Sequence, residues 1–152
     1  MDIRVDDLQG PEIVQLLSEH MQHMARITPR HSVHALDINN LRHPDITLWT
    51  VWGGAALMGC GALKQVTPSA GEIKSMRTAS DHLRKGVAAA LMTHILDEAK
   101  RRSYQQLFLE TGASDAFASA HRLYERFGFR RCGPFTGYVE DPNSVFMTRL
   151  VQ

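Results

Sequence analysis

The sequence predicts a mixed α/β domain in which helices flank one central, mostly antiparallel sheet. Gly53-Gly54 separates two apolar, β-branched stretches, which is a strong hairpin signal. The helical pattern of residues 87–100 stands between two strand-like segments, and a strand–helix–strand unit forms a right-handed parallel crossover. The end of the chain adds two strands joined by a turn at Asp141-Pro142-Asn143. The sheet is therefore antiparallel early and late, with one parallel crossover in the middle.

Length and composition indicate one soluble globular domain over residues 1–152. The chain is 43% hydrophobic and 22% charged, which is ordinary for such a domain. A formal net charge of +1 gives no general attraction to nucleic acid or to a membrane. The start of the chain shows no basic stretch followed by an apolar run, so we expect a cytoplasmic protein without a signal peptide. Cys60 and Cys132 form no metal-binding or disulfide pattern and predict two buried, reduced thiols.

The first half of the chain predicts two helices and a hairpin. Residues 1–5 alternate weakly, as in a short strand. Pro11 marks the start of an amphipathic helix that ends before Pro29, and residues 30–41 are compatible with a short second helix. Residues 46–52 and 55–66 are the hairpin strands. Trp49 and Trp52 alternate along the first of them and are expected in the core or at an interface.

The second half predicts two strands that enclose a helix, a second helix and the final pair of strands. Val87, Leu91, Ile95 and Ala99 recur every four residues, so the first of these helices has one apolar face. Ser114 or Asp115 is placed to cap the next helix, and Gly128 ends it. The elements are a strand at 71–78, a helix from 87, a strand at 104–109, a helix at 116–127, and strands at 129–138 and 145–151.

The loop before the helix at residue 87 is unusually basic. A helix start carries partial positive charge, so Arg84 and Lys85 are unfavourable there unless an anion lies between them. Gly86 has no Cβ, and a bulky anion can therefore approach the backbone closely. Two interpretations stay open: a phosphate-binding loop, or an ordinary basic loop whose helix is capped by Ser80 or Asp81.

Histidines gather in the first third of the chain. Their spacing permits metal binding, but the sequence has neither the glutamate of an HExxH motif nor a cysteine partner. We therefore expect solvated or substrate-facing imidazoles and no metal. The clustered residues are His20, His23, His31, His34 and His43.

Two motifs resemble those of the GCN5-related N-acetyltransferase (GNAT) superfamily. The loop Leu83-Arg84-Lys85-Gly86-Val87-Ala88 is similar to its Arg/Gln-x-x-Gly-x-Gly/Ala pyrophosphate loop, with Leu83 replacing the first residue. The stretch 117–129 resembles its Asn-x-x-Ala-x-x-Leu-Tyr-x-x-x-Gly-Phe motif, with Phe117 replacing the Asn. The resemblance spans nearly the whole chain and is greatest to a subgroup of small bacterial acetyltransferases. That subgroup shares the stretches 34–37, 72–78, 109–112 and 141–144.

The resemblance implies acetyl-CoA as cosubstrate and a GNAT fold whose fourth and fifth strands splay apart. The pantetheine arm would lie in the gap and pair with the exposed backbone of the fourth strand. The implied cofactor-binding residues are Met76, Arg77, Thr78, Leu83, Arg84, Lys85, Gly86, Val87, Ala88, Ala89, Thr111, Phe117 and Tyr124.

The resemblance also suggests an acid and a base for acetyl transfer. Glu72 stands where a histone-acetyltransferase branch of the superfamily has its glutamate base, and it is our candidate, directly or through water. The alternative is a structural ion pair with Lys74. Tyr124 matches the family tyrosine near the sulfur and would protonate the departing thiolate, and its alternative is a packed core tyrosine.

The acceptor side is expected in the irregular segment 29–44 and in the region 133–144. Its candidate residues are His31, His34, Asp37 and Tyr138. The leading hypothesis is acetyl transfer to the amine of a small molecule or amino acid. A protein lysine or N-terminal acetyltransferase and a non-catalytic acyl-CoA-binding module are the alternatives. Family habit and an edge strand near the C-terminus permit a homodimer.

Overall fold

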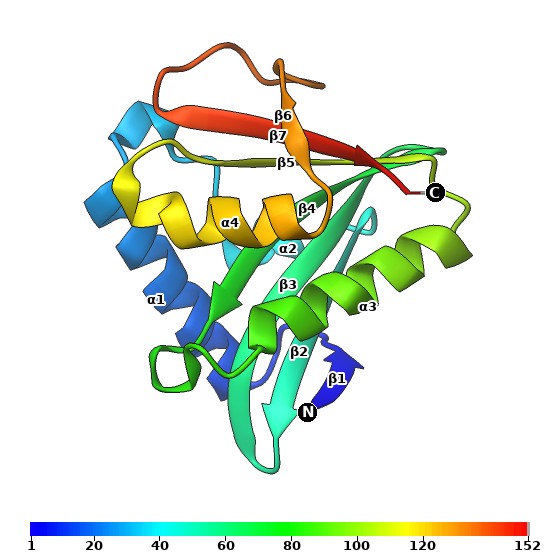
Figure 1. Cartoon of the computed structure of the whole chain (residues 1–152). Coiled ribbons are helices and arrows are strands. Elements are labelled where there is room, and N and C mark those ends of the chain that lie inside the picture. Colours follow the sequence, from blue (N-terminus) through cyan, green and yellow to red (C-terminus); the bar gives the residue numbers. More distant parts are fainter. Residues whose placement is uncertain (152) are drawn as a thin grey trace.

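The computed structural model describes residues 1–151, in which seven strands form one sheet in the order β1-β2-β3-β4-β5-β7-β6 (Figure 1). The strands are β1 Asp2–Val5, β2 Ile46–Gly53, β3 Ala56–Thr67, β4 Ala70–Thr78, β5 Gln106–Gly112, β6 Arg130–Cys132 and β7 Ser144–Leu150. The helices are α1 Pro11–Ile27, α2 Ile38–Leu41, α3 Val87–Arg101 and α4 Ala118–Arg126, with short 3₁₀ turns at η1 Arg30–Ser32, η2 Ser80–His82 and η3 Asp115–Phe117.

The pairing of the strands confirms the predicted mixed sheet. β4 and β5 run parallel and are joined through α3, whereas all other neighbours in the described sheet are antiparallel. The hairpin turn lies one residue later than predicted, because Gly53 still pairs with Ala56. Gly54 takes the left-handed backbone conformation of the turn, with φ of 61°.

Two apolar clusters hold the helices on opposite faces of the sheet. Val87, Leu91 and Ile95 of α3 share one cluster with Tyr124 of α4. Ile13 and Leu16 of α1 belong to the other, which includes core residues of β2 and β3. Figure 1 shows α3 and α4 in front of the sheet and α1 behind it. Side chains of one strand therefore alternate between an α3/α4 face and an α1 face.

β4 and β5 pair along only the first part of each strand and then separate, as predicted. Residues Ala70–Ile73 of β4 pair with Gln106–Leu109 of β5. Beyond that point the β3–β4 register shifts, and Ser75 has a φ of 55°, which bends β4 away. Residues 76–78 keep β3 as a neighbour, and within residues 1–151 no strand pairs with their other edge.

Several sequence predictions of local structure were wrong. The expected strand at 129–138 is a strand only over Arg130–Cys132, and the following residues to 143 are irregular. Phe135 in this irregular part stacks on Phe108 of β5, so apolar residues that resemble a strand instead cover the sheet face. The segment 30–41 forms two separate short helices, η1 and α2, rather than one.

The predicted helix caps were also wrong. Ser80 and Asp81 lie in η2, and the residue that caps α3 is Gly86, with φ of 81° and no side-chain cap. η3 begins between Ser114 and α4, so Phe117 occupies the cap position of α4. The predicted end of α4 is confirmed, because Gly128 follows the helix with a φ of 86°.

Candidate active site

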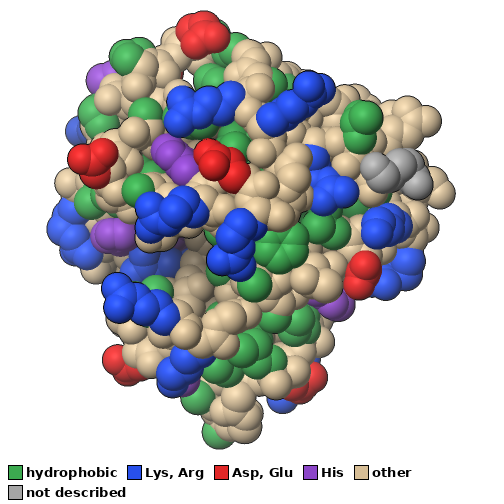
Figure 2. Space-filling model, in the orientation of Figure 1, with side chains coloured by type: hydrophobic (Ala, Val, Ile, Leu, Met, Phe, Trp, Pro, Cys, Tyr) green, Lys and Arg blue, Asp and Glu red, His purple; other side chains and the backbone are tan. Residues whose placement is uncertain are grey.

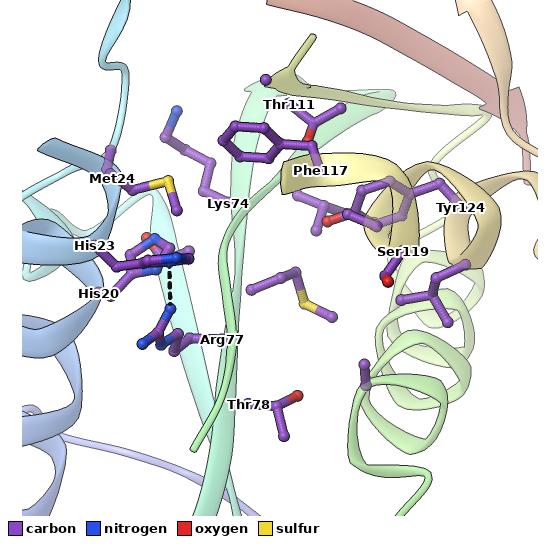
Figure 3. A pocket seen from close by; sticks show the side chains of 18 of the residues that line it. His20, His23, Met24, Lys74, Arg77, Thr78, Thr111, Phe117, Ser119 and Tyr124 are labelled. Atoms are coloured by element: carbon purple, nitrogen blue, oxygen red, sulfur yellow. Dashed lines mark hydrogen bonds between the residues drawn. The ribbon is translucent and has the colours of Figure 1, made fainter. Parts of the chain in front are cut away.

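A cavity of about 660 Å³ opens where β4 and β5 part. α1 and the residues that follow it line one side, and the start of α3 together with α4 line the other, as Figure 3 shows. Every predicted cofactor residue except Lys85 lines this cavity. Lys85 is exposed and lies near His82, with its Nζ 3.3 Å from Nδ1 of that ring.

The start of α3 forms the outer end of the cavity. Its cap residue Gly86 is exposed, and a Cβ built on it would meet no atom within 4 Å. The first turn carries no acidic residue and receives no side-chain cap, so its backbone N–H groups are available to an outside anion. Figure 2 shows Lys and Arg side chains around the hollowed part of this face. Arg84 lines the cavity here, in a left-handed conformation with φ of 62°.

Side chains of β4, β5 and η3 form the wall next to α3. Thr78 and Thr111 line the cavity from the ends of the two strands (Figure 3). Phe117 lies directly against Gly112, where a Cβ would collide with the aromatic ring. Gly112 therefore allows the ring of Phe117 to pack onto the end of β5. Phe117 stands at the position where the GNAT motif has its asparagine.

Tyr124 lines the cavity and also belongs to the core cluster of α3 and α4, so both predicted environments are present. Its side chain is 7% exposed, and its ring packs edge-on against Phe129. Burial, with a smaller effect from Glu110, raises the pKa of Tyr124 to about 12. The phenol therefore carries its proton throughout the neutral range.

Glu72 lies on the α1 face of β4 and is 4% exposed. Its Oε2 accepts hydrogen bonds from Lys74 Nζ at 3.1 Å and from Tyr138 Oη at 2.6 Å. Lys74 also donates to Tyr138 Oη at 3.0 Å, which closes a triangle. The ion pair that was the alternative for Glu72 is thus present. The carboxylate lines the cavity as well, so its role as a base stays a prediction.

Glu110 is a cavity-lining carboxylate that the sequence analysis missed. It extends from β5 beyond the last residue that pairs with β4. Burial raises its pKa, and His34, Lys74 and Ser144 partly offset this effect. The sequence signal for Glu110 was strand alternation, which places it on the same face of β5 as Phe108. The structure pairs Phe108 with Glu72, so that face also holds Glu72.

A cationic and imidazole cluster, formed by His20, His23 and Arg77, lines the inner wall beside α1. The sequence predicted solvated or substrate-facing histidines and a cofactor-binding Arg77, but not that these side chains meet. Arg77 Nη1 lies 2.9 Å from His23 Nδ1, as the dashed line in Figure 3 marks. His20 is buried beside them, and burial, Arg77 and His23 lower its pKa to about 4. The i, i+3 spacing of the histidines predicts that they share one face of α1, but it does not indicate that Arg77 of β4 lies against them.

The predicted acceptor residues have different environments. His34 lines the cavity, and its ring lies edge-on against Tyr138 with the two centroids 5.0 Å apart. Tyr138 does not line the cavity itself but contacts it through Glu72. His31 and Asp37 are exposed and outside the lining, and the Asp37 carboxylate caps α2 by accepting from the Asn40 N–H. The structure therefore does not bring His31 and Asp37 to the cavity.

The cysteines and tryptophans differ in how deeply they are buried. Cys60 is buried, and burial raises the pKa of its thiol to about 12, whereas Cys132 is only half-buried. Trp49 lies in the core and Trp52 is half-buried. Among residues 1–151 no group of three or more potential ligands could hold a metal ion. No helix in this part of the chain has the length and apolar character needed to cross a membrane.

The splayed strands, the open helix start and the buried tyrosine define the class of protein. The model of the acetyltransferase (GNAT) family matches residues 11–129, and the chain belongs to this family. A relative from Bacillus subtilis (strain 168), the uncharacterized N-acetyltransferase YsnE, is 52% identical over 149 residues, which is 98% of this chain and 99% of the relative. The uncharacterized N-acetyltransferase YedL of Escherichia coli (strain K12) is 44% identical over 146 residues, 96% and 92% of the two chains.

A solved structure shares the fold. A GNAT family acetyltransferase from Elizabethkingia anophelis, with acetyl-CoA bound, aligns with a TM-score of 0.69 and 17% identity over 98% of this chain and 97% of that one. This likeness confirms the predicted fold. The family model and the relatives establish the chain as an N-acetyltransferase of the GNAT family.

Proposed function

We propose that the protein is an acetyl-CoA-dependent N-acetyltransferase that transfers the acetyl group to the amine of a small molecule or amino acid by direct attack. One observation carries the proposal. A single cavity connects the uncapped start of α3 with two carboxylates, the buried Glu72 and the half-buried Glu110, through the gap between β4 and β5. We also propose that it acts in the cytoplasm, where acetyl-CoA is available.

The residues present fit coenzyme A. Unsatisfied N–H groups after Gly86 suit a pyrophosphate, and the missing Cβ leaves room for it. The unpaired edge of residues 76–78 suits the amide groups of a pantetheine arm, since an exposed strand edge binds an extended partner. Bound acetyl-CoA would supply an activated acetyl thioester.

A carboxylate beside the acceptor would remove a proton from the amine. Glu72 is our proposed base, and Lys74 and Tyr138 hold its Oε2 in place. A specific observation supports Glu110 as the alternative: its pKa is raised, which brings a carboxylate closer to the pH at which a general base is most effective. Tyr124, protonated at neutral pH, would donate to the departing thiolate.

The proposed function is tested by measuring thiol release from acetyl-CoA over a panel of amines and amino acids. Calorimetry with CoA shows in parallel whether the folded protein binds the cofactor. We expect CoA binding and amine-dependent thiol release. Binding without release for any amine would contradict the proposal and support a non-catalytic module. Acetylation found only when a protein extract is the acceptor, detected by mass spectrometry, would instead support the protein-acetyltransferase alternative.

The two carboxylates are distinguished by Glu72→Gln and Glu110→Gln, each measured as kcat/KM against pH. The variant that removes the base should lower kcat/KM by roughly 10²–10⁴-fold and lose the rise in kcat/KM that occurs as the pH increases through the carboxylate pKa. The other variant should keep that rise. Glu125→Gln, on the exposed side of α4, is the matched control. Equal and small losses of kcat/KM in both variants would show that neither Glu72 nor Glu110 is the base.

A further inference from the structure

Arg77 is a half-buried cation whose side chain extends from β4 to the α1 face. It makes no ion pair among residues 1–151. Its Nε is buried and has no hydrogen-bond partner among the same residues. Removing a charge and a donor from water without a partner is costly, so an arrangement of this kind is usually completed by a ligand.

The neighbours of Arg77 are imidazoles that do not neutralise it. A guanidinium can only donate, so His23 Nδ1 accepts from Arg77 Nη1, and that nitrogen carries no proton. Burial and the nearby Arg77 lower the pKa values of both His23 and His20. His20 Nδ1 is buried and also without a partner. The cluster therefore carries one positive charge at neutral pH and an excess of unused polar groups.

Lys74, another cation on this side of the cavity, already has a counter-ion. Its Nζ is paired with Glu72 Oε2 at 3.1 Å, and the two charges balance each other on the sheet face. Figure 3 places Arg77, His20 and His23 across the cavity from Tyr124 and Ser119 of α4. Met24, Ile27 and Val33 add an apolar wall next to the cluster. An anion bound at Arg77 would thus lie beside an apolar surface and on the opposite side from the start of α3.

We propose that Arg77, with His20 and His23, forms an anion subsite that binds the carboxylate of the acceptor, so that the acceptor is an amine that also carries a carboxylate. This inference rests on the proposed function and narrows it to amino acids and related amino carboxylates. The guanidinium would bind the carboxylate through charge-assisted hydrogen bonds, the strongest class available to a small ligand. With its carboxylate bound at Arg77, the acceptor would present its amine to Glu72 and Glu110.

The test compares matched acceptors in steady-state acetylation. Each L-amino acid is assayed beside its carboxamide, which keeps the α-amine and side chain but removes the negative charge. We expect the best amino acids to be favoured in kcat/KM over their amides by at least about tenfold, mostly through KM, because a hydrogen bond between two charged groups is stronger than one to a neutral amide. No preference for the carboxylates would overturn the subsite even while thiol release upheld the proposed function.

Variants then assign the preference to Arg77. Arg77→Gln should abolish the preference for carboxylates, because the KM values of the amino acids should rise to about those of their amides. Arg77→Lys should keep part of it, since the charge remains but the planar fork is lost. Arg26→Gln is the control, because Arg26 is an exposed α1 cation outside the cavity lining. A large loss of CoA affinity in Arg77→Gln would overturn the proposal and assign Arg77 to the cofactor.

Binding measurements distinguish a failure of the anion subsite from a failure of the proposed acetyltransferase function. Thermal melts with CoA and each amino acid report ternary binding without turnover, and far-UV circular dichroism checks that each variant folds. Stabilisation by carboxylates but not amides supports the subsite even if no acetyl transfer is seen. If Arg77→Gln does not fold, the comparison of carboxylate with amide in the unaltered enzyme still decides the question.

Discussion

The two halves of the cavity differ in how well their residues were predicted from the sequence. The cofactor half consists of the backbone edge of residues 76–78, the loop 83–86, the start of α3 and α4. The acceptor half consists of α1, residues 28–35, the sheet face with Glu72 and Glu110, and the side chain of Arg77. Of the predicted cofactor residues only Lys85 lies outside the lining, whereas of the predicted acceptor residues only His34 lies within it.

The difference follows from what each half uses to form its surface. The cofactor half presents backbone N–H groups and small residues from segments of consecutive sequence, and local motifs determine such groups. The acceptor half gathers side chains from four separate segments: α1, β4, β5 and the 28–35 stretch. α1, β4 and β5 are far apart in the sequence, and their contacts arise only from the tertiary fold. Local sequence patterns therefore do not predict which of their side chains meet. The predictions below test whether the two halves act as separately as their architecture suggests.

The largest expected effect concerns Tyr124, at the boundary between the halves. Tyr124→Phe removes one oxygen from a buried ring and should lower turnover by roughly 10²–10⁴-fold with little change in CoA affinity, as expected for a lost general acid. Stopped assays for turnover and calorimetry for CoA check this. Tyr104→Phe is the control, because Tyr104 is equally buried but donates to Gln65 outside the cavity. Unchanged turnover would exclude Tyr124 from the mechanism.

The buried His20 of the acceptor half should lower the free energy of unfolding in acid. The pKa of His20 falls from 6.5 when unfolded to about 4 when folded, so the unfolded state binds its proton first. Stability is therefore complete above pH 6.5 and is lost as the pH falls, by about 2 kcal/mol between pH 7 and pH 5. Denaturant titrations should show a smaller acid loss in His20→Leu than in the unaltered protein. His43→Leu, at an exposed site, should behave as the unaltered protein does.

A smaller effect should separate the cofactor half from the acceptor half. Gly86→Val adds a branched side chain at a φ of 81°, disturbs the start of α3 and fills the space left for an anion. We expect CoA to bind about tenfold more weakly, a loss of about 1.4 kcal/mol. Gly54→Val carries the same kind of backbone strain in the hairpin turn and should leave the Kd for CoA unchanged. Equal Kd values in both variants would argue against the phosphate-binding loop.

The smallest effect should come from a predicted acceptor residue that lies outside the cavity. Asp37→Ala removes the cap of α2 and should lower the free energy of unfolding by about 1 kcal/mol. Because the carboxylate does not line the cavity, kcat/KM for amine acceptors should stay the same. A marked fall in kcat/KM without a change in stability would restore Asp37 to the acceptor site.

Local errors in the prediction have a common physical cause. The stretch 129–138 has the apolar residues of a strand, but Phe135 packs on Phe108 and Tyr138 binds Glu72, so side-chain contacts replace most of the ladder. Ser114 and Asp115 are good cap residues, yet η3 intervenes because Phe117 packs against Gly112. In both places tertiary contacts override local propensity.

Local sequence patterns are sufficient to predict the order of the elements, the parallel crossover and the basic loop with Gly86. Hydrophobic periodicity, glycine and charge are local properties, and they act over a few residues at a time. Folding alone brings Glu110 beside Glu72 and Arg77 against His20 and His23. Those contacts join residues of separate elements, and their charges acquire a role only when folding removes them from water.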